Sequence, residues 1–388
     1  LLDDLGSVGL EPEVVVVAGV GARAGFADEA YREVGATVVP LADTPGLDAF
    51  DVVHALKEPT EYEAELRGPF LRLGALHLAS RPSGVCRMCA QRNFSAILDG
   101  GTVGNASYRV TGSDRTPIVG SMSRFAGTVA GRKVVEGLAD RGVGPGRVVV
   151  VGGGIAGRSA IRQVRSVTKT LVVVEPWEPM RRRLEGFLPT LGFEAFEIVP
   201  ELTDDTLDGA VGVVFAHRTG AQAAEKVCHH EQILRMTKGA AISDIAIDQG
   251  GAIAHPDYDP DDDAHVAREK YMALYDHDYA YYAEVNMPRE EPREASESHG
   301  DAALPYVTAL LALCAHEGAA DAATTRLLTH DAKIVGHDEP VDADLFDAMI
   351  QDLRNGLQLA VVEGSVRITD ADVDNDASLS AWVRDCSA

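Results

Sequence analysis

The chain has 388 residues, of which 46% are hydrophobic and 24% are charged, as is typical of a globular protein. This length exceeds what one ordinary core accommodates and favours two domains. With 60 acidic and 35 basic residues the formal net charge is −25, so the surface repels nucleic-acid phosphates and anionic membranes. No apolar run approaches the roughly 18 residues that cross a bilayer, and the first residues do not resemble a signal peptide. We therefore expect a soluble, cytoplasmic protein without a nucleic-acid or membrane partner.

The five cysteines do not form a recognisable metal site. Cys86 and Cys89 make a single C-x-x-C, whereas a four-thiolate zinc site needs a second pair. An odd number of cysteines without a secretion signal fits a reducing compartment. We expect no metal, and we interpret these two cysteines as small buried hydrophobic residues rather than a redox pair.

Strand-like and helical patterns alternate along the first part of the chain. The β-branched run at 13–17 predicts a buried strand, and a helical pattern follows at 28–34. Shorter strands are expected at 37–39 and 51–53, before an apolar stretch at 71–79. This alternation predicts a parallel sheet with crossover helices.

A proline-free helical pattern at 125–138 is expected to bridge two domains. The further expected elements are strands at 147–151, 171–174, 212–215 and 240–247, and helices at 304–313 and 342–357. We therefore expect a cofactor domain at 126–299 and a discontinuous substrate domain formed by 1–125 and 300–388.

A glycine-rich sequence directly follows the strand expected at 147–151. Residues 152–157 read G-G-G-I-A-G and fit the pattern G-x-G-x-x-G before a helix. Gly152, Gly154 and Gly157 permit a tight turn, close approach of the backbone to a pyrophosphate, and close helix–strand packing. Ile155 and Ala156 begin the helix whose positive end faces the phosphates. These residues predict a dinucleotide site.

The strand expected at 171–174 ends in Glu175, where a dinucleotide-binding fold places the acid that binds the adenosine ribose. A carboxylate there accepts hydrogen bonds from both ribose hydroxyls and repels a 2′-phosphate, so NAD is favoured over NADP. The arginines at 181–183 could reach a 2′-phosphate, but we expect them on the exposed face of the next helix.

Further motifs occur over most of the chain: K-E-P at 57–59, L-H-L-A at 76–79, M-S-x-x-A-G at 122–127, D-x-A-x-D-Q-G-G at 244–251, N-M-P at 286–288 and A-x-L-P-Y at 302–306. In order and approximate spacing they resemble the motifs of the alanine dehydrogenase family and the related transhydrogenase alpha subunit. The resemblance implies two Rossmann-like α/β domains with doubly wound parallel sheets and an active-site cleft between them. It also implies an NAD-dependent amino-acid dehydrogenase that self-associates into a homo-oligomer.

The same resemblance implies residue roles. Lys57 would hold the substrate carbonyl or carboxylate, His77 would act as acid and base, and Asp248 would lie at the reacting centre. Ser123, Asn286 and Met287 would line the cofactor site.

These residue types suit the chemistry, since oxidation of an amine to an imine removes a hydride and a proton. A neutral imidazole exchanges protons near pH 7, and an ammonium group favours negative charge developing on an oxygen.

Two features depart from the family. Its R-V-A-L-T-P segment, whose arginine grips the substrate carboxylate, is not found here, and we expect that segment to precede Leu1. Residues 292–297 read P-R-E-A-S-E and resemble saccharopine dehydrogenases, which act on a secondary amine. Two alternatives therefore stay open: an opine- or saccharopine-type dehydrogenase, and a non-catalytic NAD-binding subunit. The substrate could be alanine or a larger, more polar amino acid.

Overall fold

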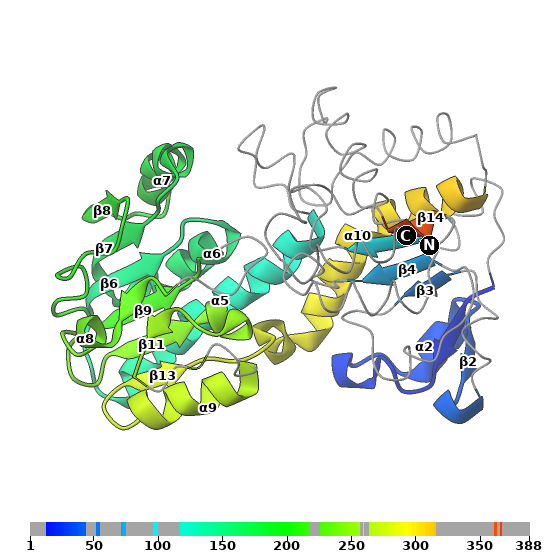
Figure 1. The fold of residues 1–388 in the computed structure, drawn as a ribbon, viewed down its shortest axis with the longest axis horizontal. Coiled ribbons are helices and arrows are strands. Elements are labelled where there is room, and N and C mark those ends of the chain that lie inside the picture. The colour runs from blue at the N-terminus through cyan, green and yellow to red at the C-terminus, as the bar shows by residue number, and fades with distance from the viewer. Residues whose placement is uncertain are drawn as a thin grey trace. The chain divides into compact units, whose positions relative to one another are not determined.

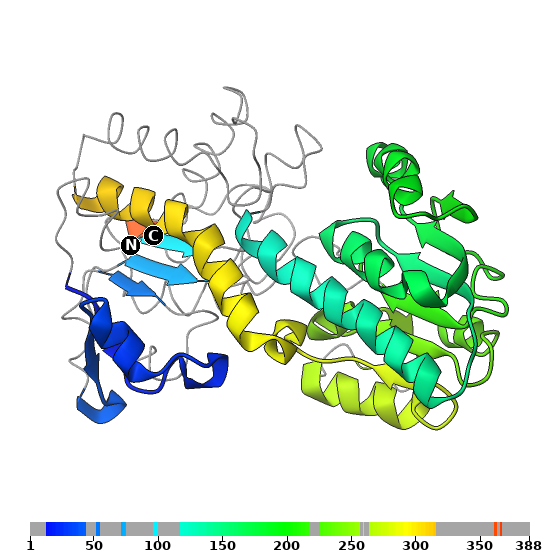
Figure 2. The same ribbon diagram turned by 180° about the vertical axis from the view of Figure 1, so that it is seen from behind.

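The computed structural model describes residues 13–43, 52–54, 71–74, 96–99, 117–217, 226–256, 259, 264–315, 361–362 and 365–366 (Figures 1 and 2). It separates into two compact units, Leu1–Ser121 with Pro292–Ala388, and Met122–Glu291. The domain limits of 126 and 299 stay a prediction. Lys57, His77, the cysteine pair and the helix expected at 342–357 lie outside the described residues.

The first unit contains short parallel strands. Its described elements are β1 (Val15–Val17), η1 (Ala22–Ala24), α2 (Asp28–Glu33), β2 (Thr37–Val39), η2 (Leu41–Asp43), β3 (Val52–His54), β4 (Leu71–Gly74), β5 (Ala96–Asp99), α10 (Pro292–Ala315), β14 (Val361–Val362) and β15 (Ser365–Val366). β1 pairs in parallel with β2, and β3, β4 and β5 form a parallel sheet in that order. The backbone N–H of Gly19 donates to Asp28 Oδ1 at 2.7 Å, which ties the turn after β1 to the start of α2.

The second unit is an α/β domain (Figure 1). Its elements are α5 (Pro117–Asp140, which begins in the first unit), β6 (Gly146–Val151), α6 (Ile155–Val164), η6 (Arg165–Val167), β7 (Thr168–Val174), α7 (Glu178–Thr190), β8 (Phe196–Val199), β9 (Gly212–Phe215), β10 (Cys228–His229), α8 (His230–Ile233), β11 (Ala241–Asp244), η7 (Ile245–Gln249), β12 (Ile253–Ala254), α9 (Ala264–Tyr275), β13 (Ala280–Tyr282) and η8 (Met287–Glu290).

Six of these strands form one parallel sheet in the order β13-β11-β9-β6-β7-β8. The chain enters at the central strand β6, moves outward through β7 and β8, and then continues on the other side of β6 through β9, β11 and β13. This is the doubly wound order of a dinucleotide-binding domain, with its topological switch point between β6 and β9. The predicted fold class is confirmed for this unit.

Helices cover both faces of this sheet (Figure 2). On one face, α5 packs closely on β9, because a Cβ added at Gly212 of β9 would contact Val134 of α5. On the other face, Tyr271 and Tyr275 of α9 belong to a buried cluster with Phe215 of β9 and other side chains from the strands. Central strands buried on both faces need continuous apolar sequence, which explains the run of four valines at 148–151.

Helices α5 and α6 approach each other very closely. A Cβ added at Gly127 would lie 2.0 Å from the carbonyl oxygen of Ala156, and one added at Gly131 would lie 2.6 Å from that of Ala160. Glycines one helical turn apart on α5 therefore face alanines one turn apart on α6. This contact fixes the start of α6, which follows the glycine-rich turn.

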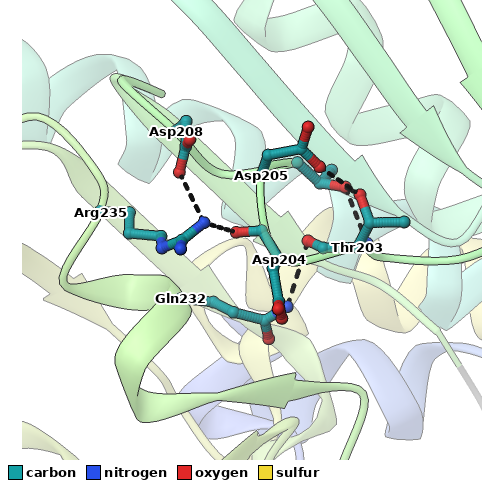
Figure 3. A network of polar contacts seen from close by, with 7 residues as sticks. Thr203, Asp204, Asp205, Asp208, Gln232 and Arg235 are labelled. Atoms are coloured by element: carbon teal, nitrogen blue, oxygen red, sulfur yellow. Dashed lines mark hydrogen bonds and ion pairs between the residues drawn. The ribbon is translucent and has the colours of Figure 1, made fainter.

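The acidic loop between β8 and β9 is attached to the segment that follows β10 (Figure 3). Gln232 Nε2 of α8 donates to the carbonyl of Thr203 at 3.1 Å. Arg235 donates to the carbonyl of Asp204 at 2.6 Å and to Asp208 Oδ1 at 3.3 Å. These acidic residues therefore have a structural partner.

Among the described helices, none combines the length and apolarity required to span a membrane.

Candidate cofactor and active site

The glycine-rich turn after β6 is built by close backbone contacts. Gly152 has a left-handed φ of 99°, and an added Cβ would lie 2.7 Å from the carbonyl oxygen of Ala216 after β9. A Cβ on Gly157 would lie 1.8 Å from the carbonyl oxygen of Gly152. Gly154, in contrast, has ordinary extended backbone and open space around its Cβ position. Gly152 and Gly157 therefore build the turn, and Gly154 leaves its outer side clear for a ligand.

The helix that starts at this turn presents unpaired backbone donors. α6 begins at Ile155 and Ala156 without a side-chain cap, so the first N–H groups of the helix remain available to an anion. Arg158 is buried and donates to the carbonyl of Gly153 at 3.0 Å. This bond holds that carbonyl on the protein side of the turn.

Glu175 lies at the carboxyl end of β7, directly beside the turn. Its Oε2 accepts a hydrogen bond from the N–H of Gly153 at 2.7 Å, and its Oε1 accepts one from the N–H of Trp177 at 2.9 Å. Only 8% of the residue is exposed. Each carboxylate oxygen retains a second lone pair, so the group can still accept from ribose hydroxyls.

Two of the three arginines at 181–183 have partners close by in the chain. Arg181 donates to the carbonyl of Glu175 at 3.0 Å, and Arg182 pairs with Glu178 one turn earlier. Arg182 and Arg183 are exposed, as expected. Arg181 and Arg182 therefore have partners within the protein.

The segment after β11 contains Asp248. Residues 245–249 form the short helix η7, and Gly250 and Gly251 follow with φ of 95° and 81°. Asp244, which is fully buried, accepts hydrogen bonds from the N–H groups of Ala246 and Ala252 at 2.9 and 2.8 Å. Asp248 thus lies in a backbone segment that is fixed at both ends.

Sequence reasoning missed Asp244 and Lys226. Asp244 is the first letter of the D-x-A-x-D-Q-G-G motif and could have been found, because a carboxylate before a tight turn commonly caps it. Lys226 Nζ donates to the carbonyls of Gly250 and Gly251 at 2.5 and 2.7 Å. Burial lowers the pKa of its ammonium to about 8, against the opposing charge of Asp244. Nothing in the sequence around Lys226 indicates this contact.

The loop after β13 contains Asn286 and Met287. Asn286 has φ 69° and ψ 56°. In the described part of the chain, it is the only residue other than glycine with a positive φ. Met287 is 2% exposed. A left-handed residue costs free energy and is often found where a backbone group must be aimed.

Ser123 lies on α5, four residues before Gly127, and is half-buried. The glycine turn, Glu175, Asp248, Asn286 and Met287 all follow the carboxyl ends of strands β6, β7, β11 and β13. Ligands of doubly wound sheets bind at this edge.

The described residues hold no group of three His, Cys, Asp or Glu side chains arranged to bind a metal.

Comparison with known proteins identifies the family. The model "Alanine dehydrogenase/PNT, N-terminal domain" matches residues 5–126, and the corresponding C-terminal domain matches 122–337. The chain belongs to the alanine dehydrogenase/PNT family. The alanine dehydrogenase of Mycobacterium tuberculosis is 30% identical over 317 residues, which is 77% of this chain and 79% of that relative. The alanine dehydrogenase of Bacillus subtilis is 27% identical and covers 76% of each chain.

Solved structures agree on the fold of this family member. An L-alanine dehydrogenase superposes with a TM-score of 0.62 at 21% identity, covering 91% of this chain and 95% of that one. A transhydrogenase from Sinorhizobium meliloti gives 0.61 at 16% identity, covering 81% and 90%. The predicted family and fold are confirmed, and the predicted function class, an NAD-dependent oxidoreductase acting on amino acids, is that of the family.

Several charged side chains between residues 284 and 297 form ion pairs within their own unit. Glu284 lies between Arg268 and Arg289 at 3.6 and 3.3 Å, and Glu291 bonds Arg132 of α5. The sequence resembling saccharopine dehydrogenases forms the first turns of α10, where Arg293 pairs with Glu297 at 3.1 Å. Arg293 also donates to the carbonyl of Gly25 at 3.0 Å, within the first unit.

Proposed function

We propose that the protein catalyses the reversible, NAD-dependent oxidative deamination of an amino acid at its α-carbon. The observation that carries the proposal is the glycine turn and Glu175 at the switch point of a doubly wound sheet, in a chain of the alanine dehydrogenase/PNT family. Position at this edge suits a dinucleotide.

The described residues fit the cofactor. The outer side of Gly154 and the first N–H groups of α6 would hold the pyrophosphate, and Glu175 would bind the adenosine ribose. Ser123, Asn286 and Met287 would border the nicotinamide. The bound cofactor supplies the acceptor for the hydride.

The chain's own residues would then handle the substrate. Lys57 would hold the carboxylate or carbonyl oxygen, and Asp248 would orient the amine. After hydride transfer has formed the imine, His77 would take a proton from the water that adds to the imine carbon and give it to the ammonia that leaves, so that the 2-oxo acid is formed. If these three groups are held in place around the substrate, their orientation would lower the barrier.

A primary amine is the favoured substrate class. The P-R-E-A-S-E sequence at 292–297 raised the possibility of a second amino acid, but Arg293 and Glu297 in this sequence pair with each other. Arg289 and Glu291, which precede it, pair with Glu284 and Arg132. This pairing removes the reason to assign them to substrate. A secondary amine remains an outcome of the test.

The test supplies NADH and 2-oxo acids with either ammonium or a panel of amino acids as the amine, and follows the absorbance of NADH. Turnover with ammonium supports the proposal. Turnover only with an amino acid as amine donor would establish the secondary-amine reaction instead. Tight NADH binding with no turnover under any condition would indicate a non-catalytic subunit.

The proposal includes self-association and a cytoplasmic location. Light scattering coupled to size exclusion measures the first directly. A mass equal to one chain at assay concentration would contradict self-association, but it would not affect the proposed reaction.

A further inference from the structure

The backbone segment that contains Asp248 is held by two charged side chains, Asp244 and Lys226. The two carboxylate oxygens of Asp244 accept hydrogen bonds from backbone N–H groups. One N–H belongs to Ala246, near the start of the segment, and the other to Ala252, after its end. Asp244 has no exposed surface. Hydrogen bonds to a buried carboxylate are among the stronger contacts in a protein.

Lys226 donates hydrogen bonds to two consecutive backbone carbonyls of the same turn. Its Nζ lies 2.5 Å from the oxygen of Gly250, 2.7 Å from that of Gly251 and 3.4 Å from the hydroxyl of Tyr271. Both carbonyls can face one ammonium because both glycines adopt left-handed φ. A Cβ at Gly251 would lie 2.8 Å from the Tyr271 ring, so that position accepts only glycine.

The placement of Lys226 opposes the usual preference of lysine for solvent. It is partly buried beside the ring of Tyr271, with Nζ 5.9 Å from the ring centroid, and burial lowers its pKa to about 8. An ammonium that gives up water in this way needs compensating acceptors. The two glycine carbonyls supply them, so the lysine and the turn stabilise each other.

We propose that Lys226 is a positioning residue, which locks the Gly250–Gly251 turn and thereby fixes the backbone that presents Asp248 to the substrate. The inference rests on the proposed function, because it requires Asp248 to act at the reacting centre. Lys226 would act through its contact with the turn.

The test compares Lys226→Met, which removes the donors at similar length, with Lys226→Arg, which retains a cation with several donors. Lys238→Met is the matched control, because Lys238 is 87% exposed and pairs only loosely with Asp278 at 3.7 Å. Turnover is expressed per NADH-binding site, so that unfolded protein does not count. If Lys226→Met does not fold, Lys226→Gln takes its place in the comparison.

We expect Lys226→Met to lower kcat by roughly tenfold or more, because a charge-assisted hydrogen bond is lost, with the Kd for NADH changed less than about threefold. Lys226→Arg should recover most of the activity, and the control should match wild type. Equal loss of kcat and NADH affinity, without rescue by arginine, would show a merely structural lysine and overturn the inference.

Hydrogen exchange gives a readout that needs no turnover. The amides of Gly250, Gly251 and Ala252 are bonded within the turn or to Asp244, so they should exchange faster in Lys226→Met while the rest of the sheet is unchanged. Unaltered exchange there would overturn the lock. A wild-type enzyme without turnover would instead refute the proposed function, while exchange still decides whether Lys226 fixes the turn.

Discussion

The carboxylate of Glu175 accepts the backbone N–H of Gly153 at 2.7 Å, which joins the proposed ribose-binding residue to the proposed phosphate-binding turn. Strand β7 places the acid, strand β6 places the turn, and one hydrogen bond couples them. A substitution at Glu175 should therefore affect both the affinity and the selectivity for the cofactor.

Glu175→Ala should weaken NADH binding by about 10- to 100-fold, because charge-assisted hydrogen bonds to the ribose are lost. It should also reduce the preference for NADH over NADPH, since the repulsion of a 2′-phosphate disappears. Fluorescence titration with both cofactors measures these effects. Glu185→Ala, on the exposed side of α7, is the control. An unchanged preference for NADH would show that Glu175 does not contact the ribose.

Gly154→Ala and Gly157→Ala should separate binding from folding. A methyl group at Gly154 meets no protein atom within 4 Å and the backbone there is extended, so stability should stay near that of wild type while NADH affinity falls. At Gly157 the methyl group would lie 1.8 Å from the carbonyl oxygen of Gly152, so the protein should lose about 1–3 kcal/mol or more of stability.

Thermal unfolding and NADH titration of the two variants test this contrast. Gly186→Ala on α7 is the control, because its Cβ position is also empty. Full NADH affinity in Gly154→Ala would place the pyrophosphate elsewhere.

Several of these features could be predicted from the sequence, and the reason is that they are local. The glycine pattern at 152–157 and the acid at 175 follow apolar strands, and strand limits such as 212–215 matched the structure. The bridging helix was expected from Phe125 but begins at Pro117, because the polar and small residues Gly120, Ser121 and Ser123 obscure its pattern. Proline at the start of a helix is tolerated, since its missing donor is not needed there.

Contacts between distant segments could not be predicted. The packing of Gly127 on Ala156 depends on how two helices cross, and the bond from Lys226 to Gly250 joins residues 24 positions apart. The residues that neighbour Gly127 and Lys226 in the sequence do not distinguish them from an ordinary helix glycine or surface lysine. Three-dimensional packing decides their roles.

Asn286→Gly and Asn286→Ala should differ in stability. Glycine adopts the left-handed φ of 69° without strain, whereas alanine pays about 1 kcal/mol there. We expect Asn286→Ala to unfold at lower temperature than Asn286→Gly. If both variants lose NADH affinity equally, the amide side chain contacts the cofactor; if only alanine does, the backbone geometry is what matters. Equal stability of the two variants would contradict the left-handed conformation.

His299 on α10 should make the protein sensitive to acid. Burial lowers the pKa of its imidazole below the ordinary 6.5, and its Nδ1 has no hydrogen-bond partner in the described part of the chain. The unfolded chain therefore binds a proton that the folded state resists, so stability falls as pH drops below 6.5. His299→Gln should reduce the loss of melting temperature between about pH 7 and pH 5, whereas the same substitution at the exposed His277 should not. Parallel pH profiles for wild type and His299→Gln would contradict the assignment.

Lys57→Ala and His77→Ala should abolish most turnover and leave NADH binding nearly intact, because the proposed roles concern substrate and protons only. The expected loss of kcat for His77→Ala is about 100-fold or more, as for other general acid–base groups. Initial rates with ammonium and a 2-oxo acid, beside NADH titration of the same samples, provide the measurement. Retained activity in either variant would remove that residue from the mechanism.

Hydride transfer to the α-carbon is the central claim, and isotope labelling tests it most directly. The protein is incubated with NADH carrying deuterium at the transferable position, ammonium and a 2-oxo acid, and the amino acid formed is examined by mass spectrometry. We expect deuterium bound to the α-carbon of that amino acid. Tight binding of NADH, with no labelled amino acid formed from any 2-oxo acid or amine supplied, would contradict hydride transfer to the α-carbon.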